Sequence, residues 1–450
     1  MASALSAPDR MWEDRITGDL ASATWRALRV LDADPGQLEA VLLLLELLGE
    51  SLPPAPPSRG KRQRKAPPRR PGDPTLRRAA QRLVEAHVAR GDLAGAVAAV
   101  RVGDRVGLEP GAALRRVAER FGRGGAPEGR AGLAPPPLPV RLPDEDPPSG
   151  LDREALDAEA RAALEAWSRA EPEPSRRAPR VALFGRLEPA ALAELLGTFT
   201  LQRVAGGERV ITEGEEGKAA YVVVRGRLAV ERGDALLGEL GPGSLFGEMA
   251  LVTEAPREAS VRAEEATLLL HAGRDDLEEA AHGSPVIGTE LTAFCRQRML
   301  ANLVTLSPIL AAVDPLQRGA LVERFRTRTF APGELLVEQG QEAAGLFLIG
   351  GGRVAVRSHD ADGEQLELAA LGAGDVVGEI SVVLRRPATA DVVATHATVA
   401  LELTRDAFRD AIRAHPQLLN ELYEVAAKRE EETRSVVAQR ALDVEEVVLL

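Results

Sequence analysis

The spacing of hydrophobic positions along this chain changes near residue 180. Over residues 20–50 and 75–110, apolar side chains recur every three to four positions, which is the period of an amphipathic helix. Asp32 to Gly36 separates the first predicted pair of helices, and Gly91 marks the turn within the second pair. After residue 180, short apolar or alternating runs are separated by glycines, which indicates strands joined by turns. The pattern predicts a helical part followed by a β-rich part.

Two stretches rich in proline, glycine and charge interrupt the helical part. Residues 51–74 contain seven Arg and Lys side chains, and we expect a linker there. A basic run could also bind nucleic acid or an acidic partner, but no aromatic side chain interleaves it to stack on bases. Residues 123–180 are expected to form a flexible linker that contains one helix, from Leu151 to Ala170. Residues 1–122 would then be an α-helical interaction module.

The second predicted helix pair weakly resembles a tetratricopeptide repeat. The resemblance rests on Leu83 and His87 in the first helix, Ala96 and Val100 in the second, and Pro110 after it. Such repeats bury their faces against neighbouring repeats, so the resemblance implies that this module contacts a protein partner. A plain helical hairpin explains the pattern equally well.

An internal repeat defines the β-rich part. Residues 204–230 align with residues 330–356, and three glycines at 207, 214 and 226 recur 126 positions later. The second copy has five extra residues around Asp360 to Glu364. A period of this length indicates two copies of one domain. We place the copies at 181–304 and 305–434, with a tail at 435–450.

Each copy is expected to be a β jelly roll closed by helices. Its short strands and glycine turns are typical of that sandwich. The closing helices are expected at Asp275–Ala281 and Ile287–Val304 in the first copy, and at Asp406–Ala414 and Gln417–Arg434 in the second. The predicted fold class is α+β multidomain, with an N-terminal helical module and two jelly rolls that end in lid helices.

The strongest chemical signal lies between Phe246 and Val261, which read FGEMALVTEAPREASV. A glycine before an apolar turn can present backbone N–H groups to an anion, and a glutamate can accept hydrogen bonds from sugar hydroxyls. An arginine can hold a phosphate with two parallel hydrogen bonds. These are the groups that a nucleotide phosphate and its ribose require.

This segment resembles the phosphate-binding cassette of cyclic-nucleotide-binding domains, in which F-G-E-x-A-L is followed by P-R-x-A-[S/T]-V. The resemblance implies that Glu248 binds the ribose 2′-hydroxyl, that Arg257 binds the cyclic phosphate, and that amides after Gly247 complete the anion site. The expected ligand-binding residues are Gly247, Glu248, Met249, Arg257, Glu258 and Ser260. Related kinases that prefer cyclic GMP have Thr in place of Glu258, so the nucleotide stays open, with cyclic AMP the commoner ligand. The alternative is an ordinary ion pair between Glu248 and Arg257 in a domain that binds nothing.

The second copy is expected to be degenerate. Its cassette keeps Gly378 and Glu379, but Ala388 and Thr389 stand where the first copy has Arg257 and Glu258. Losing one charge-assisted hydrogen bond to phosphate costs about 1.5 to 3 kcal/mol, or roughly ten- to a hundredfold in affinity.

Charged residues close to Ala388 in the sequence would also affect phosphate binding by the second copy. Asp391 is expected to add a like charge near the phosphate position. Arg385 or Arg386 could substitute for the missing arginine, although Pro387 restricts the backbone between them and position 388.

Composition excludes several other functions. Apolar residues make up 45% and charged residues 28%, as in soluble globular proteins, and we expect a cytoplasmic, bacterial protein with no membrane span and no leader. The net charge of −12 is the sum of +4 for residues 1–150 and −16 for residues 151–450, so the β-rich part should avoid nucleic acid. The single cysteine, Cys295, is expected to be a packed side chain.

Searches for catalytic, metal and DNA-binding motifs find none. The six histidines lack metal-ligand spacing, and no nucleophile, base and acid can be nominated together. The tail after the last lid helix is too short and too acidic for a DNA-binding module. We therefore expect neither enzyme activity, nor a cofactor, nor a bound metal, nor DNA as a partner.

Taken together, the sequence indicates a cyclic nucleotide sensor or adaptor. The first jelly roll would bind ligand, and the helical module would contact a protein partner; a homo-oligomer is possible. The segment Arg176 to Pro179 weakly resembles the inhibitor segment of kinase A regulatory subunits, but Pro179 and Arg180 do not fit that motif. The alternative is a structural scaffold in which both jelly rolls have lost their ligands.

Overall fold

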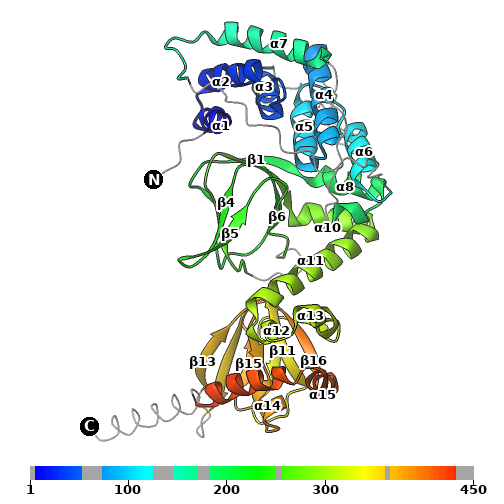
Figure 1. Cartoon of the computed structure of the whole chain (residues 1–450), viewed down its shortest axis with the longest axis vertical. Coiled ribbons are helices and arrows are strands. Elements are labelled where there is room, and N and C mark those ends of the chain that lie inside the picture. Colours follow the sequence, from blue (N-terminus) through cyan, green and yellow to red (C-terminus); the bar gives the residue numbers. More distant parts are fainter. Residues whose placement is uncertain are drawn as a thin grey trace, which may run out of the picture. The chain divides into compact units, whose positions relative to one another are not determined.

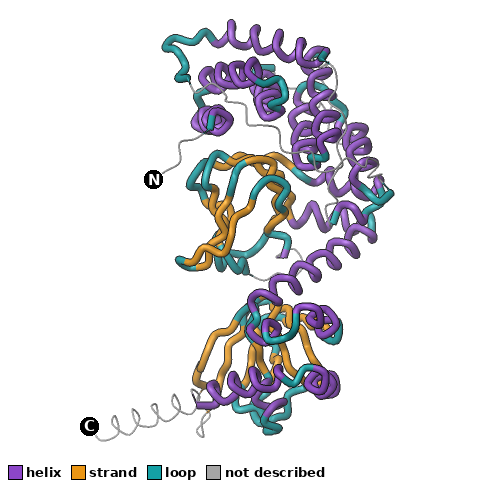
Figure 2. The backbone as a smooth tube through the Cα atoms, in the orientation of Figure 1, coloured by secondary structure: helices purple, strands orange, loops and turns teal. Residues whose placement is uncertain are grey.

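The computed structural model describes residues 6–52, 73–124, 145–170, 183–249, 256–359 and 365–431 (Figure 1). The chain forms two compact units. The N-terminal unit comprises Met1–Thr212, Ala219–Phe246 and Ala259–Leu291, and the C-terminal unit comprises Glu213–Lys218, Gly247–Glu258 and Thr292–Leu450. Each unit contains both helices and strands (Figure 2).

The N-terminal unit begins with a layer of helices whose apolar faces pack on one another. Its elements are α1 (Ala7–Thr17), α2 (Leu20–Ala33), α3 (Leu38–Glu50), α4 (Pro74–Arg90), α5 (Leu93–Arg105), α6 (Pro110–Phe121) and α7 (Arg153–Arg169). The predicted pairs over 20–50 and 75–110 are confirmed, the second pair ending at Arg105, and Gly91 ends α4 in the left-handed conformation (φ 76°). Pro110 follows the hairpin, as expected, and it also begins a further helix, where a missing N–H is harmless.

Helix α7 lies where a linker with one helix was expected. It packs against α2, α3 and α4. Trp167 donates its indole N–H to the carbonyl of Pro35 at 3.0 Å, and Arg161 pairs with Asp73 at the start of α4. In the structure this helix is therefore part of the helical layer. Residues 53–72 and 171–182, which include the basic linker and the segment Arg176 to Pro179, lie outside the described residues, and the domain boundaries stay predictions.

A jelly roll completes the N-terminal unit. After a 3₁₀ turn (Phe184–Arg186) and α8 (Pro189–Thr198), its strands are β1 (Thr200–Val204), β2 (Arg209–Ile211), β3 (Ala219–Arg225), β4 (Leu228–Arg232), β5 (Ala235–Leu240), β6 (Leu245–Phe246), β7 (Ser260–Ala263) and β8 (Thr267–Gly273). They form two antiparallel sheets in the orders β1-β8-β3-β6 and β2-β7-β4-β5. The apolar faces of both sheets meet in one core, which includes Val204, Tyr221, Val223, Leu228, Phe246 and Leu269.

The C-terminal unit repeats this topology. Its strands are β9 (Arg326–Phe330), β10 (Leu335–Val337), β11 (Gly345–Gly351), β12 (Val354–His359), β13 (Gln365–Leu371), β14 (Val376–Val377), β15 (Asp391–Ala394) and β16 (Thr398–Thr404). The sheet orders β14-β11-β16-β9 and β10-β15-β12-β13 match those of the first roll, strand for strand. The five extra residues lie between β12 and β13, as predicted, but outside the described residues. The fold class is thus confirmed as a helical N-terminal part and two jelly rolls.

Helices follow each roll, as expected. After the first come α10 (Arg274–Gly283) and α11 (Pro285–Leu306); α12 (Pro308–Ala311) and α13 (Pro315–Val322) lead into the second. Within the second lies the short α14 (Glu379–Val383), and after it come α15 (Arg405–Ala414) and a helix over residues 417–431. In the C-terminal unit, Met299 and Leu303 of α11 share a core with β11 and β16.

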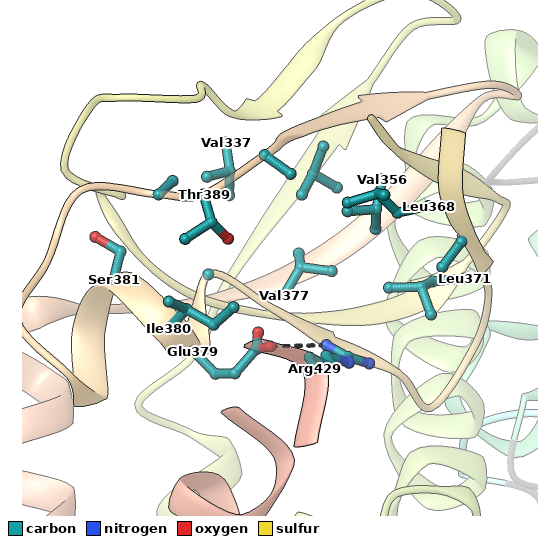
Figure 3. Close-up of a pocket in the computed structure, with 15 residues that line it drawn as sticks. Val337, Val356, Leu368, Leu371, Val377, Glu379, Ile380, Ser381, Thr389 and Arg429 are labelled. Atoms are coloured by element: carbon teal, nitrogen blue, oxygen red, sulfur yellow. Dashed lines mark hydrogen bonds and ion pairs between the residues drawn. The ribbon is translucent and has the colours of Figure 1, made fainter. Parts of the chain in front are cut away.

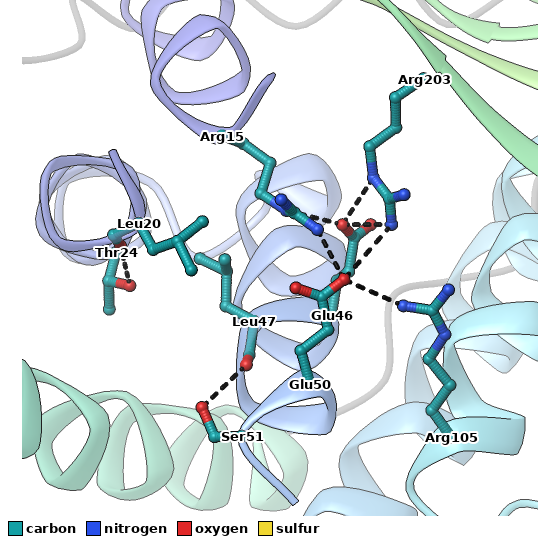
Figure 4. Close-up of polar contacts among 9 residues, drawn as sticks. All are labelled: Arg15, Leu20, Thr24, Glu46, Leu47, Glu50, Ser51, Arg105 and Arg203. Carbon is teal, nitrogen blue, oxygen red and sulfur yellow. Dashed lines mark hydrogen bonds and ion pairs between the residues drawn. The ribbon is translucent and has the colours of Figure 1, made fainter. Parts of the chain in front are cut away.

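Charged side chains join the helical layer to the first roll. Glu46 on α3 is fully buried and accepts hydrogen bonds from Arg15 (2.8 Å) and Arg203 of β1 (2.7 Å). Figure 4 shows that these arginines and Arg105 converge on Glu46 and its neighbour Glu50. A buried carboxylate is tolerable only with such partners, so these contacts fix how the helices pack on the sheet.

A second group of contacts surrounds Arg225 of β3, whose side chain is 5% exposed. Its guanidinium contacts Asp9 at 2.6 Å and Glu39 at 2.9 Å, and lies over the ring of Trp12. The partners come from α1 and α3. Both groups of contacts lie within the N-terminal unit, so its helices and its jelly roll form one body.

The described part of the chain has no helix with the length and apolar character needed to cross a membrane. Within the same residues, no cluster of His, Cys, Asp or Glu could hold a metal ion.

Candidate ligand-binding sites

The first cassette begins at Gly247, directly after β6. Gly247 has φ 78°, a left-handed conformation that favours glycine. The next residue, Glu248, is buried, and its Oε1 accepts a hydrogen bond from Nε of Arg298 in α11 at 3.1 Å. The alternative to ligand binding was an ordinary ion pair between Glu248 and Arg257. In the structure, Glu248 pairs with Arg298.

Arg257 is held in the cassette by its backbone. Its N–H donates to the carbonyl of Glu215 at 2.8 Å, and its carbonyl accepts from the N–H of Gly214 at 2.9 Å. The side chain turns towards the glycine, because Nη1 donates to the carbonyl of Gly247 at 2.6 Å. The residues expected to bind phosphate and hydroxyl are therefore neighbours within the C-terminal unit.

The remaining predicted residues of the first site are more dispersed. Met249 packs against the apolar core of the C-terminal unit, and Glu258 is half-buried beside Arg257 in sequence. Ser260 is buried at the start of β7, which belongs to the N-terminal unit. Residues 250–255 of the cassette lie outside the described residues.

The second cassette repeats this geometry. Gly378 has φ 81°, and Oε1 of the buried Glu379 accepts from Nη1 of Arg429 at 3.0 Å. Gly340 N–H donates to the carbonyl of Ala388, and Ala388 N–H donates to the carbonyl of Gln341, both at 2.8 Å. These two bonds match those of Arg257, so Ala388 occupies the structural position of the phosphate arginine.

Both glutamates thus pair with an arginine fifty residues later. Arg298 lies in α11, and Arg429 lies in the helix 417–431. Neither arginine belongs to the residues predicted from the cassette motif. The signal was present, because the two arginines are separated by the same 131 positions (429 − 298) as the two glutamates (379 − 248).

The second jelly roll contains a cavity of about 170 Å³ (Figure 3). Most of its lining is apolar and comes from strands β10, β12, β13 and β15 and from α14. Thr389, Ser381 and the pair Glu379–Arg429 supply the polar side chains. The second roll has therefore kept an internal space despite the loss of the arginine.

The charged residues near this cavity do not replace the missing arginine. Arg385 and Arg386 are exposed and do not line it; Arg386 pairs with Glu430 at 3.3 Å. Asp391, expected to place a like charge there, does not line the cavity either. Its Oδ1 accepts from the N–H of Gln339 at 2.6 Å.

Cys295 lies beside the first cassette, where its Sγ is 3.6 Å from the carbonyl oxygen of Glu248. Burial, and then the negative charge of Glu248, raise the pKa of the Cys295 thiol to about 12. A thiol with this pKa is protonated at neutral pH and unreactive. The expectation of a packed side chain is confirmed.

Comparison with known families identifies both rolls. Residues 201–283 and 327–415 match the family model of the cyclic nucleotide-binding domain. The chain carries two cyclic nucleotide-binding domains. These two matches coincide with the two jelly rolls, here called the first and the second domain. The tetratricopeptide-like character of the helical layer is not confirmed by these matches.

Among curated proteins, this chain is similar to the cAMP-dependent protein kinase type II regulatory subunit of Drosophila melanogaster. The two are 31% identical over 239 residues, which covers 53% of this chain and 59% of the relative. A cAMP-dependent protein kinase regulatory subunit of Hypocrea atroviridis is 29% identical over 50% of this chain and 49% of its own length. This chain thus spans 49% to 59% of the length of these relatives.

A solved structure, the regulatory domain of Toxoplasma gondii PKA with cAMP, is also similar. It is 25% identical with a TM-score of 0.28, covering 55% of this chain and 92% of that one.

Proposed function

We propose that this chain is a regulatory protein that binds a cyclic nucleotide in its first domain. One observation carries the proposal: Arg257, held by two backbone bonds, lies beside Gly247 and the buried Glu248 in a single cassette. A guanidinium can pair with two phosphate oxygens, and the carboxylate can accept from a ribose hydroxyl. Cyclic AMP is the first ligand to test, because the curated relatives are named as cAMP-dependent.

The pair between Glu248 and Arg298 supplies a route for the signal. A ribose hydroxyl that binds Glu248 would share this carboxylate with an arginine of α11. Ligand binding would then change the strength of a bond that holds the helix to the cassette. Only such a difference between the bound and free states can shift a helix position.

The output is proposed to be a contact with another protein. Because the curated relatives are named as regulatory subunits of a protein kinase, a kinase subunit is the partner class to test first. The helical module of residues 1–122 remains the proposed contact surface. The alternative function is a scaffold whose domains bind no ligand.

Calorimetric titration of the full chain tests the first step. We expect about one cyclic nucleotide per chain, with Arg257→Ala weakening binding by roughly ten- to a hundredfold, since one charge-assisted bond is lost. Arg257→Lys should restore little, because an ammonium lacks the planar fork. A matched control is Arg262→Ala, which removes a neighbouring arginine that pairs with Glu231 on the strand next to it.

The result separates the two functions. Binding that survives in Arg262→Ala and fails in Arg257→Ala supports the sensor. A wild-type chain that gives no heat with either cyclic AMP or cyclic GMP would leave the scaffold as the better description.

A further inference from the structure

The helix over residues 417–431 is tied to the second cassette by two adjacent side chains. Arg429 donates from Nη1 to Oε1 of the buried Glu379 at 3.0 Å, a bond drawn in Figure 3. The next residue, Glu430, accepts from Nη1 of Arg386 at 3.3 Å. Glu379 begins α14, and Arg386 follows the end of α14 by three residues. The two contacts therefore hold both ends of this cassette segment to one helix.

The rest of the same helix packs on the apolar core of the C-terminal unit. Leu418 and Leu422 belong to that core, and they and Ala426 are at most 3% exposed. Positions 418, 422, 426 and 429 recur at intervals of three or four residues, so they lie on one face of the helix. That face is buried along its length and ends at Arg429, next to the cassette.

One of the two contacts is particular to the second domain. The pair between a cassette glutamate and a helix arginine occurs in both domains. The same offset of 131 positions places Ala255 and Met299 where the second domain has Arg386 and Glu430. Neither of these side chains carries a charge, and Met299 belongs to the apolar core of the C-terminal unit. The first domain therefore lacks the residues for this second ion pair.

The backbone directly before Arg386 is strained. Arg385 has φ 53°, and within the described part of the chain it is the only residue other than glycine with a positive φ. It follows Leu384, the C-cap of α14, at a position where glycine usually takes the left-handed conformation. An arginine in this conformation costs free energy and persists only where surrounding contacts impose it. The pair that Arg386 forms with Glu430 is such a contact.

We propose that the second domain holds its lid helix, residues 417–431, against the cassette without a ligand. Position 388 has lost the side chain that would bind a phosphate, and the pair between Arg386 and Glu430 fastens the same cassette to the helix through protein groups alone. A lid held in this way does not respond to a ligand, so the second domain is a fixed element of the C-terminal unit. The inference does not depend on nucleotide binding by the first domain.

Hydrogen–deuterium exchange of the full chain, measured by mass spectrometry without ligand, tests the proposal. We expect the amides of residues 417–431 to be protected in the wild type, because their exchange requires the helix to open. Arg386→Ala and Glu430→Gln should each make this exchange about two- to fivefold faster, the size of effect expected for a largely exposed ion pair. Combining Arg386→Glu with Glu430→Arg should restore the protection, because the pair is re-formed with its charges exchanged.

Arg385→Gly is the matched control. It removes an exposed arginine from the same loop and keeps the left-handed backbone, which glycine adopts readily, so the protection should remain. Three results would overturn the proposal: unprotected amides over 417–431 in the wild type, equal exchange in Arg386→Ala and Arg385→Gly, or no recovery in the charge-exchanged variant. No nucleotide is present in these measurements, so their outcome is independent of the titrations that test the first domain.

Discussion

At the residue scale, the two cassettes differ most at one position. Arg257 and Ala388 have the same two backbone hydrogen bonds, and each lies near a buried glutamate with an arginine partner. We therefore expect Ala388→Arg to give the second domain an affinity for cyclic nucleotides. The gain should be about 1.5 to 3 kcal/mol, the worth of one charge-assisted bond. Calorimetry should show the stoichiometry rising from one towards two.

A lysine at the same position is the matched control. Ala388→Lys adds the same charge without the planar fork, so it should gain less. Replacing Asp391 as well should add little, because its carboxylate is bound to the N–H of Gln339 and does not line the cavity. A second site that stays silent in Ala388→Arg would mean that the cavity, and not the missing arginine, excludes the phosphate.

Asp92 gives the helical layer a dependence on pH. Burial opposes ionisation, but the hydrogen bond and charge of His87, 2.7 Å away, hold the pKa of Asp92 below its ordinary value. A lowered folded-state pKa stabilises the fold above the unfolded pKa, which is about 3.9, and this contribution is lost as the pH falls through the folded-state value. Gly95 makes the pair possible, since a Cβ there would lie 2.2 Å from both side chains.

We expect Asp92→Asn to lower the free energy of unfolding at pH 7 and to change it progressively less below about pH 4. Asparagine caps a helix about as well as aspartate, so the cap on Gly95 N–H should survive. Urea unfolding at several pH values measures this. A loss that is equal at pH 3 and pH 7 would assign the effect to the cap and not to the charge.

At the scale of elements, glycines with positive φ lie in the turns that connect the two sheets of the second roll. Gly352, before β12, has φ 96°, and a Cβ there would lie 2.4 Å from the carbonyl oxygen of Ala397. Gly333 has a similar φ of 90° but nothing within 4 Å. Gly333→Ala should therefore cost only the left-handed strain, about 1 to 2 kcal/mol.

Gly352→Ala should cost more than Gly333→Ala, because the methyl group also displaces backbone. Thermal unfolding of the two variants gives the comparison, since they share the backbone conformation and differ in the space around the Cβ. Equal melting points would show that the turn between β11 and β12 can shift to make room for a methyl group at position 352.

Helices and strands marked by a repeated pattern of apolar residues or glycines could be predicted from the sequence. An element without such a repeat, or its packing, could not. The glycine repeat fixed the relation of the two rolls, and apolar spacing located α2 to α5. Helix α1 was missed although Ser6 and Asp9 form a capping box at its start. Helix α7 was located, but its packing against α2 and α4 depends on side chains distant in sequence, such as Trp167 and Pro35.

The candidate sites were predictable to a similar extent. Motif spacing located Glu248, Arg257 and Ala388, but the arginines that pair with the glutamates lie fifty residues away on helices. The interior volume of the second roll also escaped prediction, because it depends on how the side chains of several strands pack.

At the scale of the whole molecule, the helical layer and the first roll form one body within the N-terminal unit. We expect Arg225→Ala to destabilise that unit by about 3 to 5 kcal/mol, because it leaves Asp9 and Glu39 without their shared cation. The matched control is Arg227→Ala two residues along the chain, where a 57% exposed arginine lies 3.6 Å from Glu265. That change should cost no more than about 1 kcal/mol.

Both full-length variants are unfolded with denaturant, and the free energy of unfolding is taken from the transition in which the fluorescence of Trp12 changes. Equal effects would argue that the layer is held by apolar packing alone. A first roll separated from its helices would expose Arg225 and Arg203, which the helices cover in the full chain. Ligand titrations therefore need the full chain.

The backbone bonds at positions 257 and 388 have an evolutionary consequence. Gly214 and Glu215 hold Arg257, and Gly340 and Gln341 hold Ala388, entirely through main-chain groups. Neither pair of main-chain bonds depends on which side chain the position carries. After duplication of an ancestral domain, one copy could drift from arginine to alanine without unfolding. Changes of ligand preference could then accumulate in one copy while selection maintained the other.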